Sequence, residues 1–358
     1  MTAPAWSGPT LAGALLALVL LAHAESAPDP GSPPAAAAAS PDAAATPAPA
    51  PPAQQSADLA PQVEAQRIEV VGEQPGPGLW KISRGDHVLW ILGTLSPLPK
   101  QLQWRPDSVE KVLGEAGTVL RGDTSVLADL GPIGALRMYL KWRRLQHNTG
   151  DRNLRQLVPE PLYARFAVLK ERYAADDDRI ETLAPVFAAR RLYEAALESA
   201  NLESGDKVPK LVLKLAKKHK VAVRTVEVKV ADPDRVMQEV LQITPEAQVA
   251  CLEATVERLE TDLKDMDARA AAWAAGDVGA LLRLPYPDQV QACWAVLAGS
   301  SGIRALAGQA RAGWLAAALE ELERSRVSLA LLPIEKLVGP DGALQALREQ
   351  GCQVQEPL

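Results

Sequence analysis

The segment Ile91–Lys100, ILGTLSPLPK, contains the first side chain that suggests a reactive site. It reads as a strand, a turn of small residues and a proline-marked exit, and ligands often bind where a strand ends in such a turn. The hydroxyl of Ser96 lies in this turn, close to Gly93 and Thr94. A serine becomes a nucleophile only when a base or a lowered pKa activates it. Because Ser96 is not within a Gly-x-Ser-x-Gly segment, the local sequence does not supply that activation.

Histidines and acidic residues do not form a metal-binding pattern. Beyond the first sixty residues the chain has three histidines, none spaced as HxxH, HxxxH or HExxH: His87, His147 and His219. A metal needs imidazole or carboxylate groups that converge in a defined geometry. The acidic run 176–178 lacks the spaced oxygen ligands of a calcium loop. The sequence therefore predicts no metal and no cofactor.

Strands are predicted near both ends of the folded region, and helices between them. A hairpin is expected around Arg84-Gly85-Asp86, and alternating helices and strands at the C-terminal end. We expect an α/β (α+β) fold in which the N- and C-terminal strands form a mixed central sheet with a large helical insertion. The predicted strands are Leu79–Ser83, His87–Leu92, Thr118–Arg121, Val221–Val228, VSLALLP from Val327 and CQVQEP from Cys352. The predicted helices are Arg105–Ala116, several in Pro132–Ser204 broken at Pro159 and Pro185, Pro209–Lys220, Thr244–Arg269, Ala307–Arg324 and one after Gly339, with Asp341 as its cap.

The first 66 residues are predicted to lie outside the fold. A run of twelve apolar residues, Leu11–Ala22, is too short to span a bilayer and is followed by Ala22-His23-Ala24, although no Lys or Arg precedes it. This pattern is typical of a signal peptide, here residues 1–24. Residues 25–66 are rich in Ala and Pro and predict a disordered tether. The folded domain is expected over 67–358, exported to the periplasm or secreted, with no transmembrane segment in the mature chain.

Charge and cysteine content limit the partners and the covalent links. The formal net charge of −6 offers no general attraction to nucleic acid. The three cysteines are Cys251, Cys293 and Cys352, so in an exported monomer at least one stays unpaired. A bridge between Cys251 and Cys293 and a pair of buried free thiols are both consistent with the sequence. No motif specifies the oligomeric state.

Three separated segments carry a resemblance to a known family. They are LWKISRGDHVLWILGTLSPLPKQLQW, GDKVPKLVLKLAKKHKVAVRTVEV and VSLALLPIEKLVGPDGALQALREQGCQV. In order and spacing they resemble the TraB/GumN family, to which the Tiki-type metalloproteases are related. The similarity covers roughly Leu79–Val354. The resemblance implies a hydrolase-like site at strand ends, with histidines from a Gly-Thr-x-His and a Gly-x-x-His segment and a nearby acidic residue.

The chain departs from the family pattern at these positions. The histidine of the first segment falls on Ser96, and that of the second falls on Lys336. The acidic residue is replaced by Gly122 or displaced to Asp123, while Glu227 matches a family glutamate. A neutral serine is a poor ligand and a protonated lysine repels a cation. We therefore expect the metal site to be lost.

The candidates for chemistry are then Ser96, Lys336, Asp123 and Glu227. Serine beside a desolvated lysine is a known nucleophile–base pair, but Asp123 or Glu335 would keep Lys336 protonated by forming an ion pair with it. Glu227 either faces the same cleft or lies on the surface at a strand end. The residues expected to line the cleft are Gly93, Thr94, Ser96, Glu335 and Lys336.

These features favour a pseudoenzyme that binds a peptide, a protein or an envelope component. The alternatives are a metal-dependent peptidase whose ligands are not recognisable from the sequence, and a metal-free serine–lysine hydrolase.

Overall fold

The structure is a computed structural model that describes residues 76–357, apart from 149, 151, 262, 285–292, 294–296, 298 and 340 and the side chains of 263 and 264. The expected signal peptide, the tether and the start of the domain at residue 67 lie outside the described residues.

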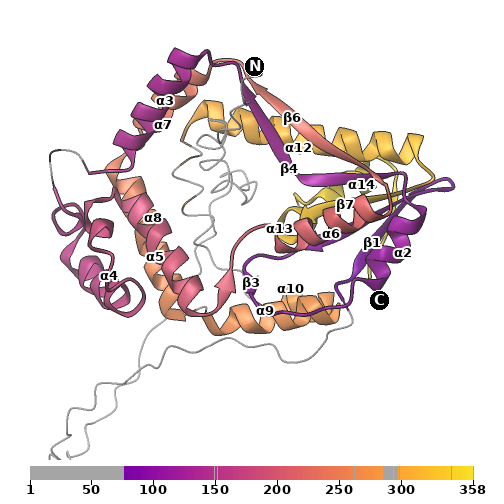
Figure 1. The fold of residues 1–358 in the computed structure, drawn as a ribbon, viewed down its shortest axis with the longest axis horizontal. Helices are drawn as coiled ribbons and strands as arrows, with labels where there is room; N and C mark the ends of the chain where they lie inside the picture. The colour runs from indigo at the N-terminus through magenta and orange to yellow at the C-terminus, as the bar shows by residue number, and fades with distance from the viewer. Residues whose placement is uncertain are drawn as a thin grey trace, which may run out of the picture.

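A six-stranded mixed sheet forms one part of the molecule (Figure 1), with the strand order β6-β4-β7-β2-β1-β8. The four strands from β6 to β2 run parallel to their neighbours, whereas β1 is antiparallel to both β2 and β8. The predicted α/β class and the pairing of N- and C-terminal strands are confirmed. The strands are β1 (Leu79–Arg84), β2 (His87–Thr94), β4 (Thr118–Ala128), β6 (Ala222–Val230), β7 (Val327–Pro333) and β8 (Gln353–Gln355), with β3 (Leu98–Pro99) and β5 (Leu202–Glu203) in a separate pair.

Helices occupy the middle of the chain and cover the sheet. The longest helix, α12, packs across β6, β4, β7 and β2 and lies behind β4 and β6 in Figure 1. Among the described residues, none of the helices is both long and apolar enough to cross a membrane. The helices are α2 (Asp107–Glu115), α3 (Pro132–Leu145), α4 (Glu160–Tyr173), α5 (Pro185–Ser199), α6 (Lys207–Lys218), α7 (Pro233–Leu241), α8 (Pro245–Thr261), α9 (Leu263–Ala275), α10 (Val278–Arg283), α12 (Ser301–Arg324), α13 (Ile334–Leu337) and α14 (Ala343–Glu349), with the 3₁₀ turns η2 (Leu154–Gln156) and η3 (Asp178–Thr182).

Among the described residues there are two large hydrophobic cores and one small cluster, which consists of Leu197, Ala200, Leu202 and Met266. The first lies around the sheet and includes Trp80, Leu89 and Leu329, all buried. The second lies among α3, α4, α5, α7 and α8, and its buried residues include Phe166 and Leu192. The strands β4 and β6 reach from the first core into the second, so the helical insertion is attached to the sheet through continuous strands.

Turn and cap residues explain most element boundaries. Gly85, with φ of +61°, and Asp86 join β1 to β2 as the predicted hairpin. Pro159 holds the N-cap position of α4 and Pro185 is the first residue of α5, because proline is tolerated at the start of a helix and not in its interior. The expectation that Asp341 caps the last helix is wrong, since Gly342 holds the N-cap position without a side-chain bond.

Strand β4 is much longer than predicted. The sequence suggested a strand over Thr118–Arg121, but β4 continues to Ala128. Its pairing with β6 shifts between Leu120 and Thr124, where four steps along β4 match two along β6. This bulge lets β4 turn away from β7, with which it pairs only as far as Leu120, and continue with β6 toward the helical core.

Of the two alternatives for Cys251 and Cys293, a bridge or a pair of buried free thiols, the structure contains the bridge. Cys251 of α8 forms a disulfide with Cys293, 42 residues further along the chain. Cys352, directly before β8, is a buried free thiol. Burial raises the pKa of the Cys352 thiol, so it stays protonated and unreactive at neutral pH.

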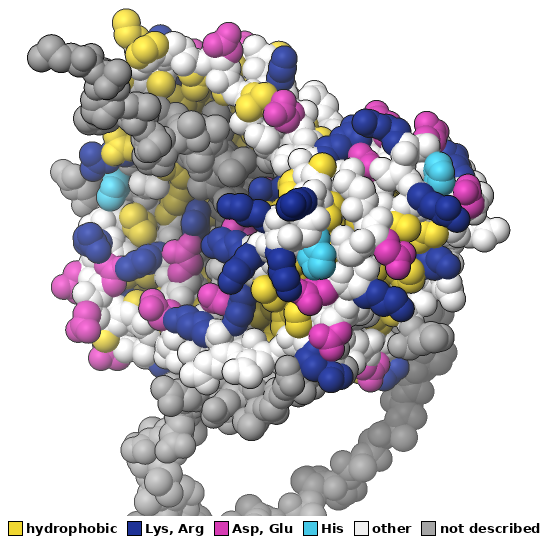
Figure 2. Space-filling view, turned by 45° about the vertical axis from the view of Figure 1, so that its right-hand side comes forward, with side chains coloured by type: hydrophobic (Ala, Val, Ile, Leu, Met, Phe, Trp, Pro, Cys, Tyr) yellow, Lys and Arg dark blue, Asp and Glu magenta, His cyan; other side chains and the backbone are white. Residues whose placement is uncertain are grey.

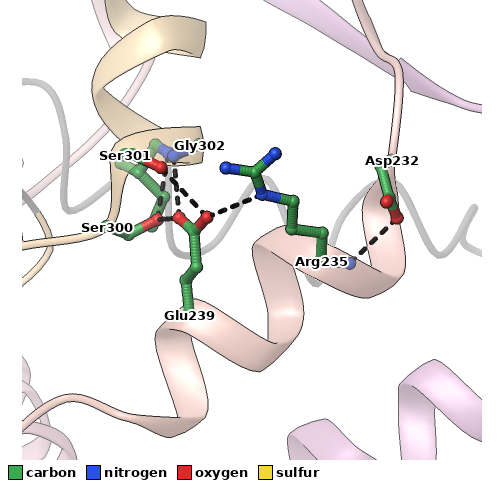
Figure 3. Close-up of polar contacts among 7 residues, drawn as sticks. Asp232, Arg235, Glu239, Ser300, Ser301 and Gly302 are labelled. Atoms are coloured by element: carbon green, nitrogen blue, oxygen red, sulfur yellow. Dashed lines mark hydrogen bonds and ion pairs between the residues drawn. The ribbon is translucent and has the colours of Figure 1, made fainter.

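The N-terminus of α12 is fixed by a carboxylate from another helix (Figure 3). Glu239 of α7 accepts hydrogen bonds from the backbone N–H of Gly302 at 2.8 Å and from the hydroxyls of Ser300 and Ser301 at 2.8 and 3.0 Å. The guanidinium of Arg235 lies 3.2 Å from the same carboxylate. These donors lower the pKa of Glu239 to about 2, because each of them favours the ionised form.

Glu239→Gln is expected to make the free energy of unfolding depend less on pH under acidic conditions. The folded pKa lies below the ordinary value of 4.5, so the stabilisation is complete above 4.5 and is lost as the pH falls toward about 2. Denaturant unfolding measured between those pH values should show a smaller decrease in the variant than in the wild type. The matched control is Glu115→Gln, an exposed carboxylate at the end of α2 that makes no ion pair in the described part of the chain. Equal slopes for wild type and Glu239→Gln would contradict the assignment.

Candidate functional site

The two segments singled out by the sequence lie side by side at the carboxyl edge of the sheet. Strands β2 and β7 are parallel neighbours, with Gly93 opposite Leu332 and Thr94 opposite Pro333. The loop that follows β2 and the short helix α13 that follows β7 therefore start from adjacent strand ends. The prediction that these segments occupy neighbouring strand ends is confirmed.

The backbone at this edge is fixed by two tryptophans. The indole N–H of Trp273 in α9 donates a hydrogen bond of 2.7 Å to the carbonyl of Gly93. A side chain at Gly93 would overlap the ring of Trp80, so the site requires glycine. Beneath the edge is a cavity of about 10 Å³, lined mainly by apolar residues that include Gly93, Trp80, Trp273 and Ile334. That volume holds roughly one water molecule and no larger ligand. Of the five residues expected to line a cleft, only Gly93 lines this cavity.

Ser96 is exposed and makes a structural contact. Its hydroxyl oxygen accepts a hydrogen bond of 3.0 Å from the backbone N–H of Gly205, just before α6. In the described part of the chain no lysine or histidine is hydrogen-bonded to this hydroxyl. Ser96 thus links the loop after β2 to the loop before α6, and nothing described here activates it as a nucleophile.

Lys336 lies in α13 and is partly buried. Burial lowers the pKa of its ammonium group, while the negative charge of the neighbouring Glu335 raises it by a smaller amount. No carboxylate within the described ranges comes close enough to form an ion pair with Lys336. The expected ion pair with Asp123 is therefore wrong, and the cause is a competing partner on β4.

That partner is Arg121, two residues before Asp123. The guanidinium Nε of Arg121 donates to the carboxylate of Asp123 at 2.6 Å, and a terminal nitrogen donates to the second oxygen, so the pair is bidentate. Both side chains project from the bulge of β4. Between them, Gly122 approaches β7 so closely that an added Cβ would overlap the carbonyl oxygen of Leu331. This explains why no side chain, acidic or otherwise, can occupy position 122.

Glu227 lies on β6, which β4 separates from β7 and β2, the strands that precede Lys336 and Ser96. It pairs with Ser125, beyond the bulge, and is exposed between the buried Val226 and Val228. The reading of Glu227 as a surface residue agrees with this exposure.

A model of the TraB/PrgY/gumN family matches residues 78–356, which is nearly the whole of the described chain. The chain belongs to the TraB/PrgY/gumN family. Neither the curated proteins nor the solved structures provide a significant match to it. The resemblance inferred from the three sequence segments is therefore confirmed.

The side chains of this TraB/PrgY/gumN family member do not fit a divalent metal at the carboxyl edge. The two positions where the resemblance implies histidines carry a hydroxyl that is bonded to backbone and a cationic ammonium. The carboxylate of Asp123 is paired with Arg121. Within the described ranges, no three His, Cys, Asp or Glu side chains converge. This donor set can hold an anionic or hydrogen-bonding group of a ligand, and it opposes a cation.

Lys336→Met is expected to stabilise the protein at neutral pH. It should also remove the increase in the free energy of unfolding that the wild type shows as the pH rises into the alkaline range. The folded pKa of Lys336 lies below its ordinary value of 10.5, so the unfolded chain binds the extra proton between these two values. In the wild type, stability should therefore rise with pH across that window, and the variant should lack the rise. Urea unfolding at several pH values between neutral and about 10.5 measures both effects. Ser96→Ala provides the comparison, because it removes a polar group from the same edge without changing a charge. A loss of stability in Lys336→Met at neutral pH would show that the ammonium has a stabilising partner.

Proposed function

We propose that this TraB/PrgY/gumN family member is a non-catalytic protein that binds a peptide, a protein or an envelope component at the carboxyl edge of β2, β7 and β4. The observation that carries the proposal is the donor set at this edge. Ser96 is bonded to Gly205, Lys336 is a partly buried cation, and Asp123 is paired with Arg121. The hydroxyl of Ser96 and the carboxylate of Asp123 are each held by another partner, which disfavours activation of a water molecule and binding of a metal by these two groups.

The same edge keeps groups that can recognise a ligand. Lys336 lacks an ion-pair partner in the described part of the chain and would gain stability from a carboxylate or phosphate group that reaches it. The exposed hydroxyl of Ser96 adds neutral hydrogen-bonding capacity. A segment with a carboxylate near an extended backbone has the chemistry that complements this surface.

We also propose that the protein is exported from the cytoplasm. The apolar run and the Ala22-His23-Ala24 pattern favour a cleaved signal peptide. The Cys251–Cys293 disulfide is typical of proteins that fold in an oxidising compartment. We propose that the protein acts outside the cytoplasm, at the periplasmic side of the envelope or in the medium.

One observation favours a second candidate, a metal-free serine–lysine hydrolase. Burial lowers the pKa of Lys336, which increases the fraction of neutral amine that can accept a proton. Against it, the hydroxyl of Ser96 faces the backbone of Gly205 and is not hydrogen-bonded to Lys336. The binding function is the better supported of the two.

The test uses the purified, processed chain in three parallel measurements. Metal content is determined after dialysis, cleavage is followed by mass spectrometry on a peptide library, and Ser96 is challenged with a fluorophosphonate probe. We expect no stoichiometric zinc, manganese or cobalt, no cleavage and no labelling. Binding is then measured by selecting peptides from a displayed library, with Lys336→Glu as the disruptive variant.

The control for binding is Lys217→Glu, which makes the same charge change on the exposed face of α6. We expect Lys336→Glu to weaken the binding of the selected peptides at least tenfold. Lys217→Glu should leave their affinity unchanged. An equimolar metal that a chelator removes with loss of cleavage would establish a metal-dependent peptidase instead. Labelling of Ser96 that is lost in Lys336→Met would establish the serine–lysine hydrolase.

A further inference from the structure

Helix α3 presents an apolar face to solvent. Ile133 is 82% exposed, Leu136 58%, Leu140 49% and Tyr139 43%. Ile133, Leu136 and Leu140 follow the spacing i, i+3, i+7, which places them on one side of a helix. In Figure 2, hydrophobic side chains appear along the upper edge of the molecule, the level at which α3 lies in Figure 1.

This face is not needed for folding. The opposite side of α3 carries Met138 and Trp142, which are buried in the helical core. The ring of Trp142 packs edge to face against Phe187 of α5, so the helix is already anchored through that side. Single exposed hydrophobic residues are normal, but four large ones on three consecutive turns form a continuous strip.

The strip is bordered by positive charge. Arg143 and Arg144 lie in the last turn of α3, are exposed, and have no ion-pair partner in the described part of the chain. Arg137 and Lys141 share a single carboxylate, that of Asp234 in α7, at 2.7 and 3.0 Å. The helix itself contains no acidic residue. A protein with a net charge of −6 thus concentrates unbalanced cations beside its most exposed apolar strip.

We propose that α3 is a docking element for an anionic phospholipid surface. Ile133, Leu136 and Leu140 would enter the boundary between headgroups and acyl chains, and Arg143 and Arg144 would contact phosphate groups. An amphipathic helix with aliphatic residues on one face and Lys or Arg beside them binds membranes in this orientation. A second copy of α3 fits less well, because it brings no carboxylate to meet the two arginines. The inference is independent of the ligand bound at the carboxyl edge.

The test is co-flotation of the processed full-length chain with lipid vesicles. Vesicles of phosphatidylglycerol and phosphatidylethanolamine should bind the protein, vesicles of phosphatidylcholine alone should bind it much more weakly, and added salt should reduce binding to the anionic ones. Leu136→Ser with Leu140→Ser should weaken binding at least tenfold. Arg143→Gln with Arg144→Gln should weaken it by about fivefold per arginine.

Two matched control variants distinguish binding through α3 from non-specific binding to vesicles. Val168→Ser removes an aliphatic side chain of 64% exposure from α4, and Lys214→Gln with Lys217→Gln removes two exposed cations from α6. Both should bind vesicles like the wild type, and all variants should keep the thermal unfolding midpoint because the altered side chains are exposed. The proposal is overturned if neither vesicle type binds, if the control variants lose as much binding as the α3 variants, or if the leucine variants only convert an oligomer to a monomer.

Discussion

Replacing Cys251 and Cys293 together by alanine is expected to lower the free energy of unfolding by about 4 kcal/mol. The disulfide closes a loop over a sequence separation of 42 residues and joins Cys293 to α8, in the helical core. Without it, the unfolded chain gains the conformational freedom of that loop, which favours unfolding. Chemical denaturation of the oxidised wild type and of the double variant, followed by circular dichroism, gives the difference.

Two controls identify the disulfide as the cause. Reduced wild type should unfold like the double variant, whereas Cys352→Ala keeps the disulfide and should respond to reductant as the wild type does. Thiol titration of denatured, unreduced wild type should find one reactive thiol, that of Cys352. Three reactive thiols in that titration would show that the bond is not formed in the protein.

Gly122→Ala is expected to destabilise the fold by about 3 kcal/mol. An added Cβ would overlap the carbonyl oxygen of Leu331, which belongs to the backbone of β7 and cannot move aside as a side chain can. Relief would require β4 to separate from β7 near Leu120, where the pairing of these two strands ends. The free energy of unfolding in urea is the measurement.

The matched control is Gly114→Ala in α2. A Cβ at Gly114 meets nothing within 4 Å, and alanine favours a helix over glycine, so this variant should gain about 0.5–1 kcal/mol. Opposite signs for the two substitutions are the expected result. If Gly122→Ala is as stable as the wild type, the close approach of β4 to β7 is not as tight as described, and position 122 could accommodate a side chain.

Local signals were enough to predict much of the fold. The hairpin followed from Gly85 and Asp86, and the C-terminal strand–helix–strand unit followed from its alternating hydrophobic pattern. The extension of β4 beyond Arg121 was missed because residues 122–125 are small or polar and have little tendency to form a strand. The strand continues because β6 pairs with Thr124, Ser125 and the residues after them, and such pairing between distant segments overrides local propensity.

The site was predictable only in part, for a similar reason. The adjacency of the loop after β2 and α13 came from the family resemblance, which carries tertiary information. The Arg121–Asp123 pair does have a local signal, because residues i and i+2 of a strand share a face. The bond between Ser96 and Gly205 joins residues 109 positions apart, and no local pattern indicates it. The burial of Lys336 likewise depends on the packing of α13 against the sheet.

The continuity of β4 and β6 has a consequence for cooperativity. Val119 and Leu120 of β4 belong to the sheet core, whereas Val126 belongs to the helical core, and β6 is divided in the same way between Val226 and Val228. Neither core can dissolve without removing strands from the other, unlike two domains joined by a flexible linker. The slowest-exchanging amide protons of the helical insertion and of the sheet should therefore exchange with solvent at the same rate, through one global opening.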